Sequence, residues 1–194
     1  MKAFITEFRT ALVATAILAV ILCGAYPLTV WVLGRGLFPA RADGSLLRKD
    51  GVVIGSRLLA QGFSGPGYFH PRPSAAGKGY DATASGGSNL GPLSKALMED
   101  IGERVLRFRA ENGLAAGAPV PADAVTASAS GLDPHISLRN AELQTPRVAR
   151  ARGLDPAVVQ AEVAGCTEGR DLGLFGEPRV NVLMLNAALD ALKK

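Results

Sequence analysis

The chain has 194 residues, of which 48% are hydrophobic and 20% charged, with a formal net charge of +4 at pH 7. The charges are scattered, and no basic stripe alternates with aromatic side chains, which argues against nucleic-acid binding. Of the two cysteines, Cys23 lies in an apolar run and Cys166 lies alone in the rest of the chain, so we expect no disulfide between them.

A short lead, residues 1–10, precedes an apolar run at residues 11–33 that contains no charged side chain. A helix of that length extends about 34 Å, enough to cross a hydrocarbon core of about 30 Å. The alternatives are a signal peptide, a lipoprotein anchor at Cys23 and a buried core helix. The run exceeds the usual apolar region of a signal peptide, about 7–15 residues, and Leu22 does not suit the position before a lipidated cysteine. We predict one uncleaved transmembrane helix, bent at Pro27.

Charge leaves the orientation of this helix open, because the C-terminal flank carries more Lys and Arg than the lead does. Residues 34–50 are rich in glycine and charged side chains, and we expect them to form a connector. The remaining residues, 51–194, are long enough for one domain.

The domain is predicted to be mixed α+β. We expect a strand at residues 52–59 and an ordered Gly- and Pro-rich surface loop at residues 62–92. The helical patterns predict five further segments: a helix from Pro92 to about Asn112, a helical turn at 121–126, a helix from Ser137 or Asn140 to Arg152 interrupted at Pro146, a helix from Pro156 to about Cys166, and an apolar, buried helix at 180–192.

The best local constellation for chemistry is Asp133-Pro134-His135, in which a carboxylate on a tight turn could orient an imidazole for acid–base work. The alternative is a turn in which Asp133 binds its own backbone and His135 begins a helix, and we favour this one. The segment Ser85, Gly86, Gly87, Ser88 and Asn89 is the second candidate. Its backbone N–H groups could converge on an anion, or its glycines could let it approach a neighbouring segment.

Four arginines in or beside loops could bind carboxylates or phosphates: Arg72, Arg147, Arg170 and Arg179. The sequence has neither a G-x-S-x-G motif nor a complete P-loop, and its histidines and cysteines lack the spacing of metal ligands. We therefore expect a protein without a catalytic site or a metal of its own.

Several longer motifs follow one another in a distinctive order after the apolar run. They are YF at 68–69, RPSA at 72–75, ASGGSNLGP at 84–92, TASASGLDPHIS at 126–137, PRVA at 146–149, TEGR at 167–170, GEPRVNVL at 176–183 and LN at 185–186. With one N-terminal span before them, they make the chain resemble the C subunit of Kdp-type potassium-transporting ATPases, the KdpC family, over nearly its whole length.

The resemblance implies a non-catalytic subunit of an ATP-driven potassium uptake pump in the bacterial inner membrane, with its domain extracytoplasmic. The implied partners are a channel-like potassium-binding subunit, a P-type ATPase subunit and a small fourth peptide. The resemblance also implies a catalytic chaperone that raises the affinity of the ATPase subunit for ATP, and ATP as a possible ligand. The candidate contacts are Arg72, Ser85–Asn89, Asp133, His135, Arg147 and Arg179.

Two alternatives from other classes stay open. One is a membrane-anchored extracytoplasmic hydrolase that uses Asp133 and His135, and the other is a passive anchored binding module. Contact of an outer domain with ATP inside the cell conflicts with the implied topology, so any influence on the ATPase would have to pass through partner subunits or through the anchor.

Overall fold

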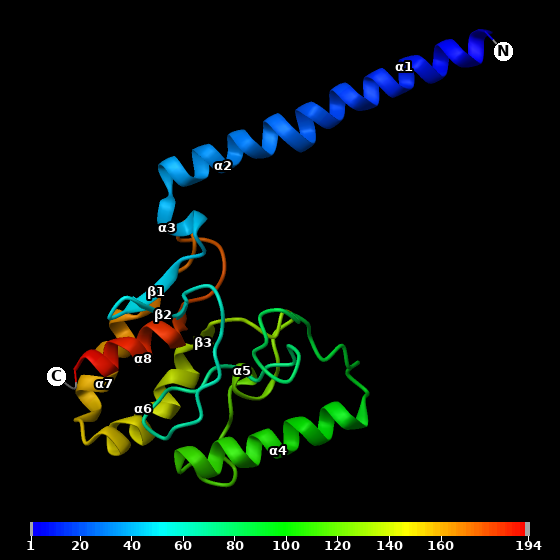
Figure 1. The fold of residues 1–194 in the computed structure, drawn as a ribbon. Helices are drawn as coiled ribbons and strands as arrows, with labels where there is room; N and C mark the ends of the chain where they lie inside the picture. The colour runs from blue at the N-terminus through cyan, green and yellow to red at the C-terminus, as the bar shows by residue number, and fades with distance from the viewer. Residues whose placement is uncertain (1, 193–194) are drawn as a thin grey trace. The chain divides into compact units, whose positions relative to one another are not determined.

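The computed structural model describes residues 2–192, so residue 1 of the expected lead and residues 193–194 of the expected domain lie outside the described part. The chain divides into two compact units, Met1–Leu46 and Leu47–Lys194 (Figure 1).

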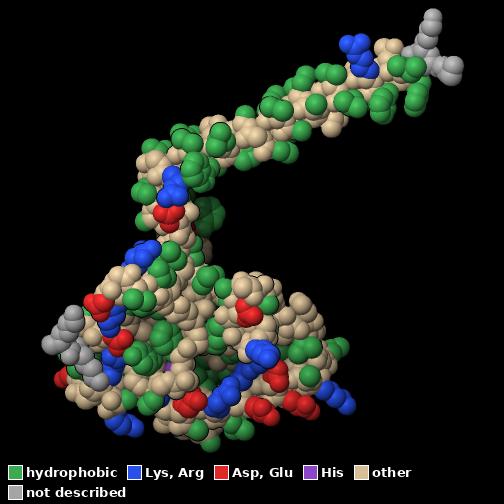
Figure 2. Space-filling model, viewed as in Figure 1, with side chains coloured by type: hydrophobic (Ala, Val, Ile, Leu, Met, Phe, Trp, Pro, Cys, Tyr) green, Lys and Arg blue, Asp and Glu red, His purple; other side chains and the backbone are tan. Residues whose placement is uncertain are grey.

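The first unit is dominated by a long apolar helix in three parts: α1 (Lys2–Ala19), a π-helical stretch (Val20–Ala25) and α2 (Tyr26–Leu37). Within residues 2–192, this is the one helix long and apolar enough to cross a membrane, and none of its apolar stretch is buried. Figure 2 shows hydrophobic side chains along its visible length. The expected lead at residues 1–10 is helical from Lys2 onward and continues directly into the apolar run.

Pro27 explains the π-helical stretch. Proline has no N–H, and its ring crowds the carbonyl four residues earlier, that of Cys23. The chain widens by one residue before the proline, so that the N–H of Tyr26 donates to the carbonyl of Ile21, five residues back. The expected disturbance at Pro27 is therefore a wider turn in a continuous helix.

The expected connector at residues 34–50 contains regular structure. Helix α2 ends at Leu37, a short helix α3 (Pro39–Ala42) follows, and β1 (Leu46–Lys49) pairs with β2 (Val52–Ser56). The turn between the strands, Asp50-Gly51, has positive φ at both residues, 51° and 80°. Asp-Gly is a strong signal for a two-residue hairpin turn, so this hairpin was predictable from the sequence.

The second unit contains a small antiparallel sheet in the order β3-β5-β4, formed by β3 (His135–Ser137), β5 (Arg179–Asn181) and β4 (Thr167–Glu168). His135 lies opposite Asn181, and Glu168 lies opposite Arg179. Strands of two or three residues are too short to show the alternation of apolar and polar side chains by which strands are recognised, so these strands were not predicted from the sequence. The expected helix at 180–192 accordingly begins later, as α8 (Val182–Ala191), with the Asn181 side chain as its cap.

Three helices enclose the core beside this sheet: α6 (Leu138–Arg152), α7 (Pro156–Gly165) and α8. Ser137, one of the two residues at which this helix was predicted to begin, caps α6, and Asp155, directly before the predicted start at Pro156, caps α7. Helix α6 passes through Pro146 without interruption. Pro146 and the residue whose carbonyl loses its partner, Glu142, are both exposed, so water can bind the freed carbonyl.

Helix α4 (Lys95–Asn112) packs against α5 (Ala122–Val125) and α6. It begins three residues after Pro92, because the Ser94 hydroxyl accepts the N–H of Leu97 and caps it. It ends as expected before Gly113, whose φ of 66° lies in the left-handed region.

The expected loop at residues 62–92 contains neither helix nor strand, but part of it lies inside the domain. Phe69 is fully buried in the core. Asn186 accepts the N–H of Phe69 (2.8 Å) and donates to its carbonyl (3.0 Å). Gln144 does the same for His70, at 2.7 and 3.0 Å. Two buried amide side chains thus take the place of a neighbouring strand.

Two arginines complete this arrangement on the preceding residues. Arg147 donates to the carbonyls of Pro66 (2.7 Å) and Tyr68 (3.0 Å), and Arg152 donates to the carbonyl of Gly67 (2.6 Å). Side chains of α6 and α8 therefore bind all five successive carbonyls of residues 66–70, a set of contacts that we call the loop clamp.

Replacing Asn186 with alanine leaves the buried N–H and carbonyl of Phe69 without partners. We expect Asn186→Ala to lower the free energy of unfolding by about 2–4 kcal/mol, measured by chemical denaturation of the full chain in detergent. Gln160→Ala, at an exposed position of α7, is the control and should change the free energy by less than about 0.5 kcal/mol. Equal effects of the two substitutions would show that the clamp does not hold the loop.

Candidate functional site

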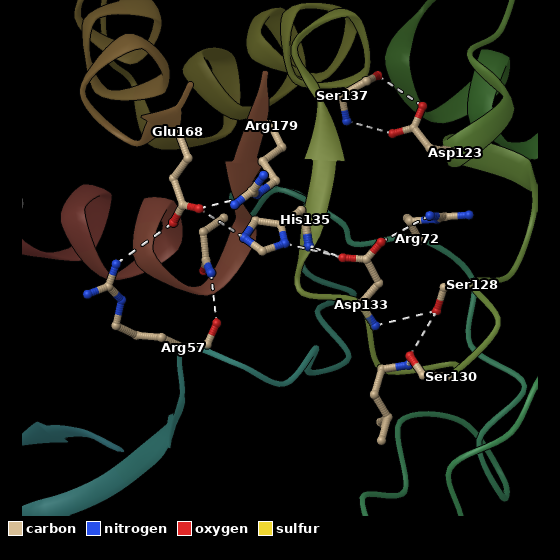
Figure 3. Close-up of polar contacts among 12 residues, drawn as sticks. Arg57, Arg72, Asp123, Ser128, Ser130, Asp133, His135, Ser137, Glu168 and Arg179 are labelled. Carbon is tan, nitrogen blue, oxygen red and sulfur yellow. Dashed lines mark hydrogen bonds and ion pairs between the residues drawn. The ribbon is translucent and has the colours of Figure 1, made fainter. Parts of the chain in front are cut away.

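Four of the predicted site residues meet in one chain of ion pairs, shown in Figure 3. Arg72 pairs with Asp133 (3.0 Å), and the other oxygen of Asp133 lies 3.3 Å from Nδ1 of His135. Nε2 of His135 lies 3.5 Å from Glu168, and Glu168 also pairs with Nε of Arg179 at 3.3 Å. We call these five residues the ion-pair chain.

The small sheet brings these residues together. His135 is the first residue of β3, Glu168 is the last of β4, and Arg179 is the first of β5, the strand between them. Glu168 could not be predicted from the sequence, because no local pattern shows that a two-residue strand will place it near His135. Arg57, which follows β2, approaches Glu168 at 3.8 Å from another direction.

Asp133 stays ionised despite partial burial. Burial raises the pKa of this carboxyl, but hydrogen bonds from the ring and backbone N–H of His135 and from the Arg72 guanidinium outweigh it, so the pKa lies below its usual value. The backbone bond, His135 N–H to Asp133 at 3.0 Å, is the turn that the sequence analysis favoured. His135 begins strand β3, however, and not a helix.

The surroundings of His135 favour a structural bridge over acid–base catalysis. Both ring nitrogens face carboxylates, those of Asp133 and Glu168, so neither points at an open substrate position. Among residues 2–192, no group of three or more His, Cys, Asp or Glu side chains is placed to hold a metal ion. The arrangement joins the loop before β3 to β4 and β5.

The Ser85–Asn89 segment is not part of the ion-pair chain; its first residues pack against the turn at 128–131. The N–H of Gly86 (2.9 Å) and the hydroxyl of Ser85 (3.0 Å) both donate to the carbonyl of Ser130. A Cβ on Gly87 would approach the carbonyl oxygen of Ala129 at 3.0 Å. Of the two alternatives for this segment, the geometry favours close approach to a neighbouring segment over binding of an anion.

Of the remaining predicted arginines, Arg147 belongs to the loop clamp. Besides its two carbonyl partners, it donates to Asn112 (3.0 Å) and Gln144 (2.7 Å), and burial lowers the pKa of its guanidinium. Arg170 pairs with Glu177 at 2.8 Å in the loop between β4 and β5. Arg147 therefore binds neighbouring groups of the chain itself, and Arg170 forms an exposed ion pair.

A cleft of about 290 Å³ between α4 and the loop at residues 62–92 was not predicted from the sequence. Arg104 and Arg107 of α4 line it together with the aromatic rings of Phe63 and Tyr80 and the imidazole of His70. The sequence favours an ion pair between Glu103 and Arg107 by spacing. Within the described part of the chain, the guanidinium of Arg107 forms no ion pair or hydrogen bond and lines the cleft instead.

His70 connects this cleft to the loop clamp. Its backbone is held by Gln144, and its ring lies 3.2 Å from the carbonyl of Gly65 and 3.5 Å from the carboxylate of Glu111. Burial and the positive charge of Arg147 lower the pKa of the His70 imidazole, and they outweigh the opposing effects of Gly65 and Glu111.

Sequence comparison places the chain among known proteins. The sequence model of the family described as "KdpC: K+-transporting ATPase, c chain" matches residues 8–191. Three similar proteins are named potassium-transporting ATPase KdpC subunit. The protein of Nitratidesulfovibrio vulgaris is 56% identical, over 97% of this chain and 95% of its own length. That of Caulobacter sp. is 52% identical, over 96% of this chain and 94% of its own length. That of Mycobacterium tuberculosis is 51% identical, over 96% of this chain and 98% of its own length.

The fit between the Ser85–Asn89 segment and its neighbour gives a prediction for Gly131. Its φ is +68°, and a Cβ there would lie 2.6 Å from the backbone nitrogen of Ala76 and 2.7 Å from the carbonyl oxygen of Gly86. We expect Gly131→Ala to lower the free energy of unfolding by about 2–4 kcal/mol. Gly117→Ala, where a Cβ meets nothing within 4 Å, should be nearly neutral in the same denaturation measurement, and similar losses would contradict the packing.

The lowered pKa of His70 predicts a dependence of stability on pH. In the unfolded chain the His70 imidazole takes up a proton near pH 6.5, whereas in the folded chain it does so only at lower pH. The free energy of unfolding should therefore fall as the pH decreases below about 6.5. His70→Gln cannot take up this proton, so its melting temperature should decline less steeply between about pH 6.5 and pH 5. Parallel melting curves for the two proteins across this interval would refute the assignment to His70.

Proposed function

The chain belongs to the KdpC family of K+-transporting ATPase c chains, so it is an accessory subunit of a potassium pump, and from that premise we propose how it acts. We propose that it is held in the bacterial inner membrane by its apolar helix, with its domain outside the cytoplasm. There it assembles with a channel-like potassium-binding subunit, a P-type ATPase subunit and a small fourth peptide, and stabilises the complex.

The observation that carries this proposal is the exposure of the apolar helix. No residue of its apolar stretch is buried by the rest of the chain. Such a surface is stable only against lipid or against the helices of other subunits. Trp31 near one end, with Arg35 5.7 Å from its ring, suits the boundary between lipid and water.

The domain contributes a surface of defined shape. The loop clamp holds residues 66–70 rigidly, and the close fit of Gly131 against Gly86 holds the later part of the same loop. A rigid loop loses little conformational freedom when it docks, which favours assembly. We therefore propose that the Gly- and Pro-rich loop at residues 62–92 contacts the partner subunits.

We further propose that the subunit acts as a chaperone of the ATPase subunit, raising its affinity for ATP from a distance. The donors of Ser85 and Gly86 are already bound to Ser130, which argues against a nucleotide cradle there. The effect would pass through contacts between subunits or through the anchor, as a change in the balance between two states of the ATPase. No geometry favours the anchored hydrolase, because both nitrogens of His135 face carboxylates.

The test is purification of the tagged full chain from membranes in mild detergent, with its candidate partners co-expressed. We expect two large membrane subunits to be recovered, together with potassium-stimulated ATP hydrolysis. A matched chain lacking residues 47–194 retains the anchor. It should recover less of the complex, and that complex should need several-fold more ATP for half-maximal rate.

Two results would count against the proposal in different ways. A full chain that purifies alone from cells containing the partners contradicts its role in assembly. A complex whose ATP requirement is the same with and without residues 47–194 contradicts a chaperone role of the domain, leaves the anchor as the one remaining route for that effect, and leaves assembly intact.

A further inference from the structure

The loop between β4 and β5, residues 169–178, carries three large apolar side chains at its tip. Leu172, Leu174 and Phe175 are 89%, 75% and 64% exposed. In Figure 1 this orange loop extends away from the sheet from which it arises. Large apolar side chains that lie together within four successive residues and face water commonly mark a site of contact with a protein, a membrane or a ligand.

The tip has a defined backbone. Asp171 and Phe175 exchange two backbone hydrogen bonds, of 2.8 and 2.9 Å. Leu172 has a positive φ of 54°, which is unfavourable for a residue with a branched side chain, and Gly173 follows with φ of 75°. A turn that holds leucine in this conformation keeps its apolar side chain at the tip at a cost in stability.

The charges at the base of the loop are paired. Arg170 binds Glu177 at 2.9 and 2.8 Å, and Arg179 binds Asp171 at 3.3 Å through both terminal nitrogens. The loop therefore has an apolar tip above a nearly neutral base. It can leave water without exposing an isolated charge to a medium of low polarity.

The base of the loop lies near the place where the chain enters the domain. Glu168, the last residue of β4, approaches Arg57 at 3.8 Å, and the carbonyl of Arg57 accepts a hydrogen bond from Asn181 of β5. Arg57 directly follows β2. Strands β1 and β2 are joined by two residues and so pair antiparallel, which puts the end of β2 at the same end of the hairpin as the start of β1.

The chain arrives at β1 from the apolar helix after eight residues, 38–45. Such a segment spans at most about 28 Å. Because residues 38–45 are so short a connection, they keep the domain permanently close to the bilayer. At the resulting high effective concentration, a weak contact is enough to be occupied most of the time.

We propose that residues 172–175 insert into the lipid surface of the bilayer in which the chain is anchored. Three side chains are far fewer than the roughly 20–30 residues that each side of a stable protein interface contributes. Leucine and phenylalanine at a protruding tip are suited to the boundary between headgroups and acyl chains. Because the base is neutral, the insertion does not require anionic lipids. The inference rests on the proposed membrane anchor.

The test uses the full chain in vesicles of zwitterionic phosphatidylcholine with brominated acyl chains, which quench tryptophan on contact. Trp31 is the single tryptophan of the chain. Its emission in the unaltered chain reports on the anchor, and Trp31→Phe with Phe175→Trp reports on the loop. We expect the loop reporter to lose about half of its emission or more and to shift to the blue, as for a side chain at acyl depth.

The matched control is Trp31→Phe with Met98→Trp, at a position of α4 that is 67% exposed and belongs to another part of the domain. It should emit as in water, without quenching. Substituting Leu172 and Leu174 with serine in the loop reporter should restore emission, while adding anionic lipid should leave the quenching unchanged.

The outcomes separate the two proposals. If Trp31 is not quenched in the unaltered chain, the anchor itself is refuted. If Trp31 is quenched but the reporter at position 175 is not, the anchor stands and lipid insertion is overturned. A blue shift without quenching that appears only when partner subunits are added, or only at high protein-to-lipid ratio, likewise overturns lipid insertion and assigns the loop to a partner or to a second copy.

Discussion

The domain depends on a partly buried length of backbone that has no neighbouring strand. Residues 66–70 place the Phe69 side chain in the core, and peptide groups left unpaired at such a position would be costly. Asn186, Gln144, Arg147 and Arg152 bind the five successive carbonyls. Because these side chains come from α6 and α8, the clamp fixes those helices relative to the long loop. The clamp also fixes the point from which the rest of that loop extends to the cleft and to the turn at 128–131.

Helix boundaries were predictable from sequence where a local signal sets them. Ser137, Asp155 and Gly113 end or begin helices in the structure as their residue types indicate. The three-stranded sheet was not predictable, because its strands have two or three residues and pair across long sequence separations. Val180 illustrates the difference: it continues the apolar pattern of the following helix, yet its pairing with β3 and β4 makes it part of a strand.

The candidate site was predicted only in part, for the same reason. Asp133 and His135 are neighbours in sequence, so their contact was foreseeable, but Glu168 reaches them only through the sheet. Arg147 was one of four arginines that could bind an anion by their position, and in the structure it donates to backbone carbonyls, because peptide groups without a neighbouring strand need donors as much as a ligand would. The proline- and glycine-rich loop is thus a surface segment, as predicted, that is held to the core through Phe69, which suits a subunit that presents a rigid surface to its partners.

Hydrogen exchange at Phe69 and His70 tests the central role of the clamp most directly. In the detergent-solubilised full chain, we expect these two amides to exchange as slowly as the core amides of α6, although they lie outside any helix or strand. Exchange at the rate of an exposed loop amide, such as that of Gly117, would contradict it. The buried backbone would then be open to water, and the domain would need another source of rigidity.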